Sequence, residues 1–343
     1  MTLFSLVGPA LAALGQVPQE LQIADVEALL QRHYPNLSTD RPALLGTLSG
    51  SAGCERVSAL LRAAYPDAHT VTLIALSGGR PSGLRALALE QLEQVDLGAG
   101  SALLYVPPLA RPAAVETFQD TVSRLRAPDG CSWDREQTHR SLREGFQEEA
   151  YEVLDALDRG DLQALQEELG DVLLHVLMQA QIASESGEFR MSDVVRQVNE
   201  KIIYRHPHVF AGLSVAGVEQ VLVNWEELKQ QEKEAREAAP SMLEGISPAM
   251  PALARAQSIQ RHVDRTGILS AAVDELRARA SGALDDLLRQ TDPGTREAIL
   301  GDLLFEVVNL ARKLGVDAEG ALRQANARFE ARFRARELTI RES

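Results

Sequence analysis

Residues 148–171, EEAYEVLDALDRGDLQALQEELGD, predict two helices joined by a very short turn. Gly160 stands where a left-handed residue commonly ends a helix, and Asp161 is a residue type that caps the start of the next helix. A connection of this length makes the two helices antiparallel neighbours. The sequence therefore predicts a helical hairpin whose inner faces lie against each other.

Four acids have a mirrored spacing about the turn of this hairpin. Glu152 and Glu168 each lie eight residues from Gly160, and Glu149 and Asp171 each lie eleven residues from it. At about 1.5 Å of rise per residue, each pair stands at one height along the two helices. Residues three apart also share one helix face. If the two faces oppose each other, the four carboxylates converge on one spot.

A cluster of four carboxylates is costly without a cation, because like charges repel and each loses hydration on burial. Oxygen ligands alone favour Mg²⁺ or Mn²⁺ over zinc. The alternative is a charged hairpin that faces water, which is the usual meaning of two acids three residues apart. The metal site is favoured here because apolar residues surround the acids in the sequence: Leu154, Leu157, Leu162, Leu165, Leu169, Val172 and Leu173.

The bulk composition limits the class of protein. Of 343 residues, 45% are hydrophobic, which suffices for the cores of two or three domains. Acids outnumber bases 49 to 35, which argues against a general nucleic-acid binder. Only two cysteines occur, and no basic segment precedes the apolar start, so we expect a cytoplasmic protein without disulfides. The longest apolar stretch, 172–183, is too short to span a membrane.

The pattern of apolar residues in the sequence changes near residue 112. Short apolar runs at 41–48, 70–76 and 101–106 predict buried strands, and 54–65 predicts a helix between two of them. Three prolines then mark a boundary, after which helical periodicity dominates. We predict four parts: an α/β region at 1–112, a helical domain at 113–225, a charged linker helix at 226–240 and a second helical domain at 241–343.

The two helical domains look duplicated. LGDVLLHVLMQA at 169–180 matches LGDLLFEVVNLA at 300–311, and RQVNEK at 196–201 matches RQANAR at 323–328, at offsets of 131 and 127. A chance likeness of two amphipathic helices is the weaker alternative. In the second copy Asp302 remains, but Ile299 stands where Glu168 has its counterpart, and Ala and Ser fill the other expected ligand positions. We therefore predict that this copy is inactive and serves packing or dimerisation.

The acid pattern resembles the motif of the MazG family of nucleoside triphosphate pyrophosphohydrolases, within the all-α NTP pyrophosphatase group. The family's EExxE and ExxD stand here as Glu148-Glu149-x-x-Glu152 and Glu168-x-x-Asp171. The likeness extends upstream to LRAPDGCSWDREQTH, downstream to VNEKIIYRHPHVF, and through the second helical domain to about residue 337. A small departure is Ser132, where the family usually has proline.

The resemblance implies hydrolysis of a nucleoside triphosphate to the monophosphate and pyrophosphate, as house-cleaning of the nucleotide pool. Glu149, Glu152, Glu168 and Asp171 would hold Mg²⁺, with Mn²⁺ as a substitute, and one of them or Glu148 would take the proton of the attacking water. The implied fold is multidomain, with two tandem MazG-type helical bundles in the all-α C-terminal two-thirds of the chain. A homodimer is implied as well.

Four further residues are candidates for binding the nucleotide. Asn199, Lys201 and Arg205 lie about one helical turn apart and offer donors to a triphosphate, the alternative being a solvated cationic face. Trp133 suits stacking on a base, although a lone Trp is more often a packing residue. The histidines of this region receive no ligand role: His139, His175, His206 and His208.

The N-terminal region resembles the rear half of a tetrapyrrole methylase domain, through YPDAHTVTLI at 65–74 and LYVPPLARPAAVETFQDTVSRLRAPDGC at 104–131. The glycine-rich half that would hold S-adenosylmethionine is missing, so we predict a degenerate α/β remnant without methyltransferase activity. Two other functions stay open: a non-catalytic helical dimerisation or interaction module and, less favoured, a tetrapyrrole methyltransferase. The intact acid quartet favours the enzyme, because an interaction module has no need of converging acids.

Overall fold

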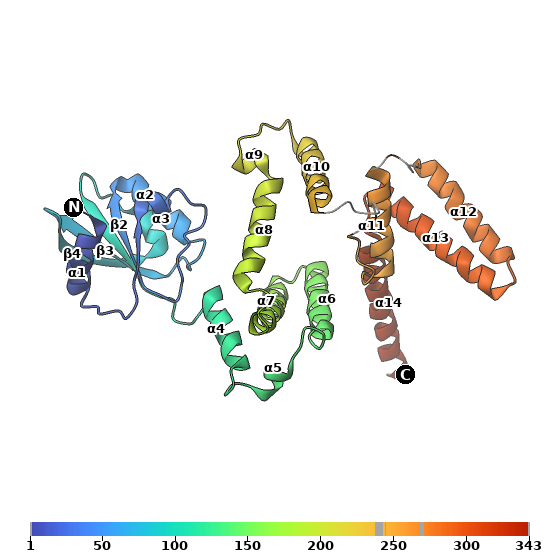
Figure 1. Ribbon diagram of the computed structural model, residues 1–343, viewed down its shortest axis with the longest axis horizontal. Coiled ribbons are helices and arrows are strands. Elements are labelled where there is room, and N and C mark those ends of the chain that lie inside the picture. The colour runs from blue at the N-terminus through green and yellow to red at the C-terminus, as the bar shows by residue number, and fades with distance from the viewer. Residues whose placement is uncertain (1, 237–242, 244, 266, 268–270, 342–343) are drawn as a thin grey trace. The chain divides into compact units, whose positions relative to one another are not determined.

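The computed structural model describes residues 2–236, 243, 245–265, 267 and 271–341 (Figure 1). The chain forms two compact units. The first comprises Met1–Leu157 and Asp161–Val194, and the second comprises Asp158–Gly160 and Val195–Ser343. The first unit holds a β-sheet followed by helices, whereas the described elements of the second unit are all helices.

The N-terminal part of the first unit is a five-stranded sheet in the order β1-β2-β5-β3-β4. β1 runs parallel to β2, and the other neighbouring strands are antiparallel. The strands are β1 (Gln22–Asp25), β2 (Ala43–Ser49), β3 (Thr70–Ser77), β4 (Arg80–Ala88) and β5 (Ser101–Val106). The expected α/β character of this region is confirmed.

The three strands predicted from apolar runs are β2, β3 and β5, and the predicted helix at 54–65 is α3 (Gly50–Leu61). The two strands that the sequence did not predict, β1 and β4, are the edges of the sheet. β4 contains Pro81 and Gly83 and is largely exposed, so it lacks the apolar pattern of a buried strand. Proline is tolerated at a sheet edge because a backbone donor is not needed there.

Both faces of the sheet are covered, which explains why β2 and β5 are largely apolar. On one face, α1 (Leu3–Leu14) packs over Leu44, Ile74 and Leu103. On the other face, α2 (Val26–Leu29), α3 and the 3-10 helix η1 (Leu89–Gln94) contribute to a larger core with Leu45 and Leu104. Successive residues of one strand therefore enter different cores, as the alternation of side chains along a strand requires.

Five helices follow the sheet along the chain: α4 (Val115–Arg126), α5 (Ser132–Glu136), α6 (Arg143–Arg159), α7 (Leu162–Glu185) and α8 (Met191–Arg205). α4 packs on α7, and Val122, Leu142, Leu177 and Met178 form a separate buried core of the first unit. α8 begins in the first unit and ends in the second. The helical domain expected after residue 112 is therefore helical in the structure.

Arg126 makes an ion pair and hydrogen bonds within this helical region. Its side chain is only 6% exposed, and its Nη2 lies 2.6 Å from Oε2 of Glu185 at the end of α7. The same guanidinium donates to the backbone carbonyls of Asp134, in the middle of α5, and Gln137, directly after its last residue. One buried cation thus connects α4, α5 and α7.

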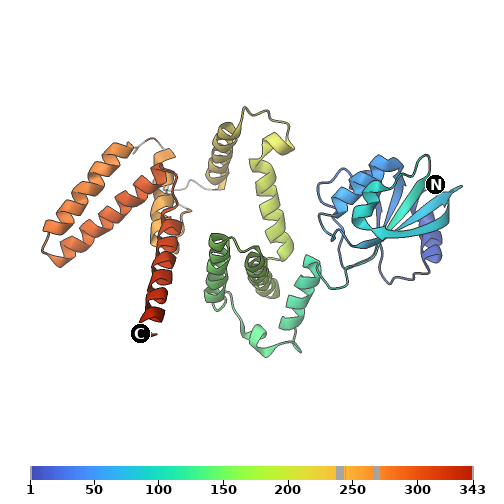
Figure 2. The ribbon, with the colours of Figure 1, turned by 180° about the vertical axis from the view of Figure 1, so that it is seen from behind.

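The second unit contains α9 (Pro207–Phe210), α10 (Val218–Arg236), α11 (Ala252–Arg265), α12 (Val273–Arg289), α13 (Pro293–Lys313) and α14 (Ala318–Arg341). α12 and α13 lie side by side in both views, and α11 also packs on α13 (Figures 1 and 2). Leu276 and Val308 are buried in this packing. The predicted second helical block is helical, and its origin as a tandem repeat stays a prediction.

The predicted charged linker helix at 226–240 falls within α10 as far as Arg236, and residues 237–240 lie outside the described residues. Across the described part of the chain, no helix has the length and hydropathy that a bilayer crossing requires.

Candidate metal centre

The turn between α6 and α7 has the local structure that the sequence predicts. Gly160 follows the last residue of α6 with a φ of 67°, in the left-handed region that glycine adopts without strain. Asp161 caps α7, because its side chain accepts hydrogen bonds from the backbone N–H groups of Gln163 and Ala164. Both signals at this turn are confirmed.

The two helices are antiparallel neighbours, as the short connection predicts. A Cβ added at Gly145 of α6, fifteen residues before Gly160, would meet the ring of His175 of α7, fifteen residues after Gly160, at 3.0 Å. Helices that diverged from the turn would separate these two positions widely, because each lies about 22 Å from the turn at about 1.5 Å of rise per residue. α6 and α7 therefore lie side by side along the hairpin.

Three of the four predicted acids converge between these helices. Glu149 and Glu152 of α6 and Glu168 of α7 each offer a carboxylate oxygen, and these oxygens all lie within 4.8 Å of one another. Asp171 is not part of this group of three, but its charge acts on Glu149. Oxygens at this spacing are suited to a divalent cation between them, since Mg²⁺ and Ca²⁺ bind carboxylate oxygens at about 2.0–2.6 Å.

The electrostatics of the acids agree with the pairing by height. Burial and then the charge of Asp171 raise the pKa of Glu149. The pKa of Glu168 is also raised, by desolvation first, then by the charge of Glu152 and by a hydrogen bond with it. Each raised carboxyl thus has as its strongest charged neighbour the acid predicted to stand at the same level. Without a cation, the cluster favours bound protons.

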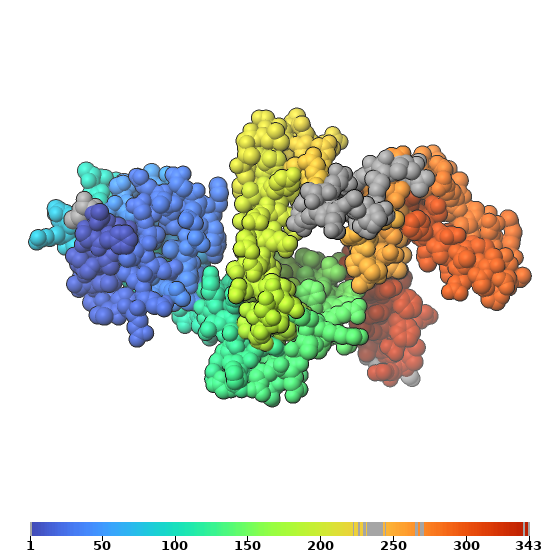
Figure 3. Space-filling view, in the orientation of Figure 1, coloured from blue at the N-terminus to red at the C-terminus, as the bar shows by residue number. Residues whose placement is uncertain are grey.

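The expected apolar surroundings of the acids form only in part within one chain. Leu154 and Leu157 of α6 and Leu162 and Leu169 of α7 are all exposed, with Leu162 at 77%. The green surface of α6 is visible in the space-filling view of Figure 3. The other three apolar residues of the prediction are partly buried: Leu165, Val172 and Leu173.

Comparisons with known proteins show the family of this chain. Residues 137–210 match the model of the MazG nucleotide pyrophosphohydrolase domain. Over 226 residues the chain is 42% identical to the nucleoside triphosphate pyrophosphohydrolase/pyrophosphatase MazG of Thermotoga maritima, covering 65% of this chain and 86% of that protein. The chain belongs to the MazG family.

Two further relatives define how far the likeness reaches. The nucleoside triphosphate pyrophosphohydrolase of Escherichia coli K12 is 41% identical over 226 residues, which are 64% of this chain and 86% of that protein. The uncharacterized protein YabN of Bacillus subtilis is 34% identical over 285 residues, 81% of this chain. The present chain spans only 58% of the length of YabN.

The part of the chain that matches the MazG domain contains all four acids of the quartet. Glu148 lies next to Glu149 on α6, is exposed, and is the weakest of the charges that raise the pKa of Glu149. Glu167, beside Glu168, is exposed as well. Neither belongs to the group of converging oxygens, so the structure gives both a flanking position.

The predicted nucleotide-binding residues of this MazG chain are divided between the two units. Trp133 lies on α5 of the first unit and is 66% exposed, so its ring is not a packing residue within the chain. Asn199, Lys201 and Arg205 lie on the part of α8 that belongs to the second unit. There the guanidinium of Arg205 lies over the ring of Trp225, 5.2 Å from its centroid, a contact that sequence reasoning did not single out.

His175, a histidine without a predicted ligand role, lies on α7 beside the acids. It lies one helical turn after Asp171 and packs edge-on against Phe146 of α6, with ring centroids 5.9 Å apart. A Cβ added at Gly145 would come within 3.0 Å of its ring, so this glycine allows the close approach. Burial lowers the pKa of His175, whereas the charge of Asp171 acts in the opposite direction.

Proposed function

We propose that this chain is a Mg²⁺-dependent nucleoside triphosphate pyrophosphohydrolase, which converts an NTP and water into the NMP and pyrophosphate. The observation that carries the proposal is the convergence of Glu149, Glu152 and Glu168 within 4.8 Å in a chain of the MazG family. The relatives from T. maritima and E. coli bear the name of this activity. House-cleaning of the nucleotide pool is the role that we assign to it.

The acids suit a hard divalent cation. Their donor set is made of carboxylate oxygens alone, and the raised pKa values of Glu149 and Glu168 reflect charges that a bound cation would neutralise. Glu149, Glu152, Glu168 and Asp171 would hold Mg²⁺, or Mn²⁺ in its place. When bound, the ion supplies charge neutralisation at the phosphates and lowers the pKa of the attacking water.

Side chains of the protein supply proton acceptance, triphosphate binding and base stacking. One carboxylate of the quartet, or Glu148 at its edge, takes the proton of the water that attacks the α-phosphorus. Lys201 and Arg205 offer cationic donors to the triphosphate, and Asn199 offers an amide on the same helix. The exposed ring of Trp133 is available to stack on a base.

We also propose that the chain acts as a homodimer. Leu154, Leu157, Leu162 and Leu169 leave an apolar surface beside the acids, which an isolated monomer would expose to water. A second copy of the same helices would cover this surface and make the acids less hydrated. The same surface is the observation that favours the alternative of an interaction module. A cytoplasmic location is proposed with it.

Release of pyrophosphate tests the proposal directly. We expect the full chain to release pyrophosphate from one or more members of a panel of standard and damaged NTPs with Mg²⁺, and to release none in EDTA. Glu152→Gln and Glu168→Gln should abolish turnover, whereas Glu167→Gln, an exposed acid next to the cluster, should keep it. Full activity of both cluster variants would remove the site assignment, and inactivity of the wild-type chain on the whole panel would favour the interaction module.

A further inference from the structure

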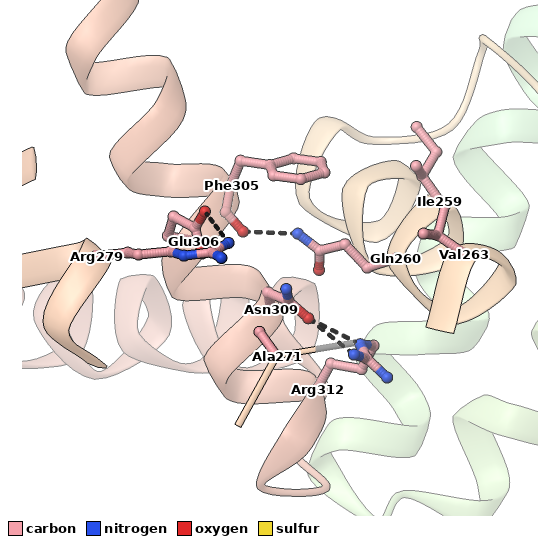
Figure 4. Close-up of a pocket in the computed structure, with 9 residues that line it drawn as sticks. All are labelled: Ile259, Gln260, Val263, Ala271, Arg279, Phe305, Glu306, Asn309 and Arg312. Atoms are coloured by element: carbon pink, nitrogen blue, oxygen red, sulfur yellow. Dashed lines mark hydrogen bonds and ion pairs between the residues drawn. The ribbon is translucent and has the colours of Figure 1, made fainter. Parts of the chain in front are cut away.

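A second, separate cavity lies in the helices of the second unit. It has a volume of about 230 Å³ and is bounded by residues of α11, α12 and α13 (Figure 4). None of the four acids of the metal centre lines it. Its walls include Ile259 and Gln260 of α11 together with Phe305 and Glu306 of α13.

Two hydrogen-bond acceptors of this cavity are buried without a donor. Gln260 is only 5% exposed, and its Nε2 donates to the backbone carbonyl of Phe305 at 2.7 Å. That bond fixes the orientation of the amide, so Oε1 points away from the carbonyl and has no partner among the described residues. Oε2 of Glu306 is also buried without a partner in the described chain. Leaving such acceptors unpaired is costly, so a donor is expected to reach them.

The cationic side chains at the cavity are held by other acceptors. Arg279 donates to Glu275 of its own helix, and its Nη1 lies 3.8 Å from Oε1 of Glu306. Arg312 donates to Oδ1 of Asn309 and forms an ion pair with Asp264 at 2.8 Å. The two arginines therefore order the rim, while Oε1 of Gln260 and Oε2 of Glu306 are buried without a hydrogen-bond partner among the described residues.

The size and walls of the cavity select a class of ligand. Sites for drug-sized molecules measure roughly 300–1,000 Å³, so a volume of about 230 Å³ suits a single heterocycle better than a whole nucleoside triphosphate. Phe305 provides an aromatic wall and Ile259 an apolar one, which favour a flat ring. A carboxylate in the wall disfavours phosphate groups, and two acceptors require N–H donors on the ligand.

We propose that this cavity binds a nucleobase or nucleoside whose edge carries two adjacent N–H donors, as the N1–H and exocyclic amine of guanine do. The carboxylate of Glu306 and the amide oxygen of Gln260 accept from this edge, and Phe305 lies against the ring. The inference goes beyond the proposed hydrolysis, because this site needs neither the acid quartet nor Mg²⁺.

Titration calorimetry of the full chain in EDTA tests the site, with guanosine as the probe. We expect saturable binding of guanosine. Inosine, which lacks the exocyclic amine, should bind roughly tenfold more weakly, as loss of a hydrogen bond to a charged group predicts. Glu306→Gln should weaken guanosine at least as much and erase its advantage over inosine. Glu152→Gln, which alters the metal centre, should leave this binding unchanged.

Methyl NMR of the wild-type chain keeps the test independent of variant folding. Guanosine should shift the methyl resonances of Ile259 and Val263, which line the cavity, at the concentrations that produce the heat. The proposal is overturned if guanosine gives no saturable binding, if these methyl signals do not move, or if Glu306→Gln binds guanosine as the wild type does. Loss of binding in Glu152→Gln would also overturn it, because the nucleoside would then occupy the acid hairpin.

Discussion

Glu168 of α7 and Glu152 of α6 each place a carboxylate oxygen within 4.8 Å of the other. At this distance the two negative charges repel each other, so a shared proton or a cation between the carboxyls stabilises the pair. Desolvation and the charge of Glu152 raise the pKa of Glu168 in the same direction. The stability of the hairpin should therefore depend on whether protons or a metal ion are bound between these carboxyls.

The first prediction concerns the pH dependence of stability without metal. When folding raises the pKa of a carboxyl, the folded chain keeps a proton that the unfolded chain has lost. The contribution of Glu168 to stability therefore falls as pH rises from the ordinary glutamate pKa of 4.5 through the raised value. We expect Glu168→Gln to gain stability over the wild type as pH increases in EDTA, measured by urea midpoints. A difference that stays constant with pH, or an equal gain in Glu167→Gln, contradicts this origin.

The second prediction concerns the cation. The proposed Mg²⁺ site exists in the folded cluster and not in the unfolded chain, so Mg²⁺ at 100 times its Kd should stabilise the fold by about 2.7 kcal/mol and raise the thermal midpoint. The rise should be larger at pH 7 than at pH 4.5, because protons compete for the same carboxylates. Differential scanning calorimetry measures it, and Glu149→Gln and Glu152→Gln should each reduce the shift. Equal shifts in these variants would show that Mg²⁺ binds elsewhere.

The third prediction separates the two Leu-Gly-Asp sequences of the chain. Asp171 lies at the acid cluster, whereas Asp302, at the matching position of α13, lies beside Arg279 and Gly282. Asp171→Asn should reduce pyrophosphate release by roughly 100-fold or more, since even supporting partners of metal ligands are worth 10–100-fold. Asp302→Asn should stay within about twofold of the wild type. Equal losses in the two variants would mean that both helical pairs act in turnover.

The fourth prediction concerns the start of α7. Asp161 accepts hydrogen bonds from two backbone N–H groups, so Asp161→Ala should lower local stability by about 1 kcal/mol, while Asp161→Asn should retain most of it. Hydrogen exchange at the amides of Gln163 and Ala164 reports the change. Asp292→Ala provides the matched control, because Asp292 caps α13 by accepting from the N–H of Thr295. It should speed exchange at Thr295 and leave α7 unaffected.

Local features of the chain were readable from the sequence. The Gly-Asp turn at 160–161, the buried strands β2, β3 and β5, and the helices after residue 112 follow from backbone preference and from apolar periodicity over a few residues. The acid quartet was found in the same way, since its mirrored spacing depends only on helical rise. Edge strands such as β4 escaped prediction because an exposed edge does not need apolar residues.

Relations between distant segments were decided by the tertiary structure. The exposure of four leucines on α6 and α7 and the exclusion of Asp171 from the tightest group of oxygens depend on which surfaces the helices bury. The cavity with Gln260 and Glu306 brings together residues 46 positions apart, and no spacing rule connects them. Sequence periodicity specifies which face of a helix is apolar, but packing among all the helices determines which partner covers that face and which polar atoms remain unpaired.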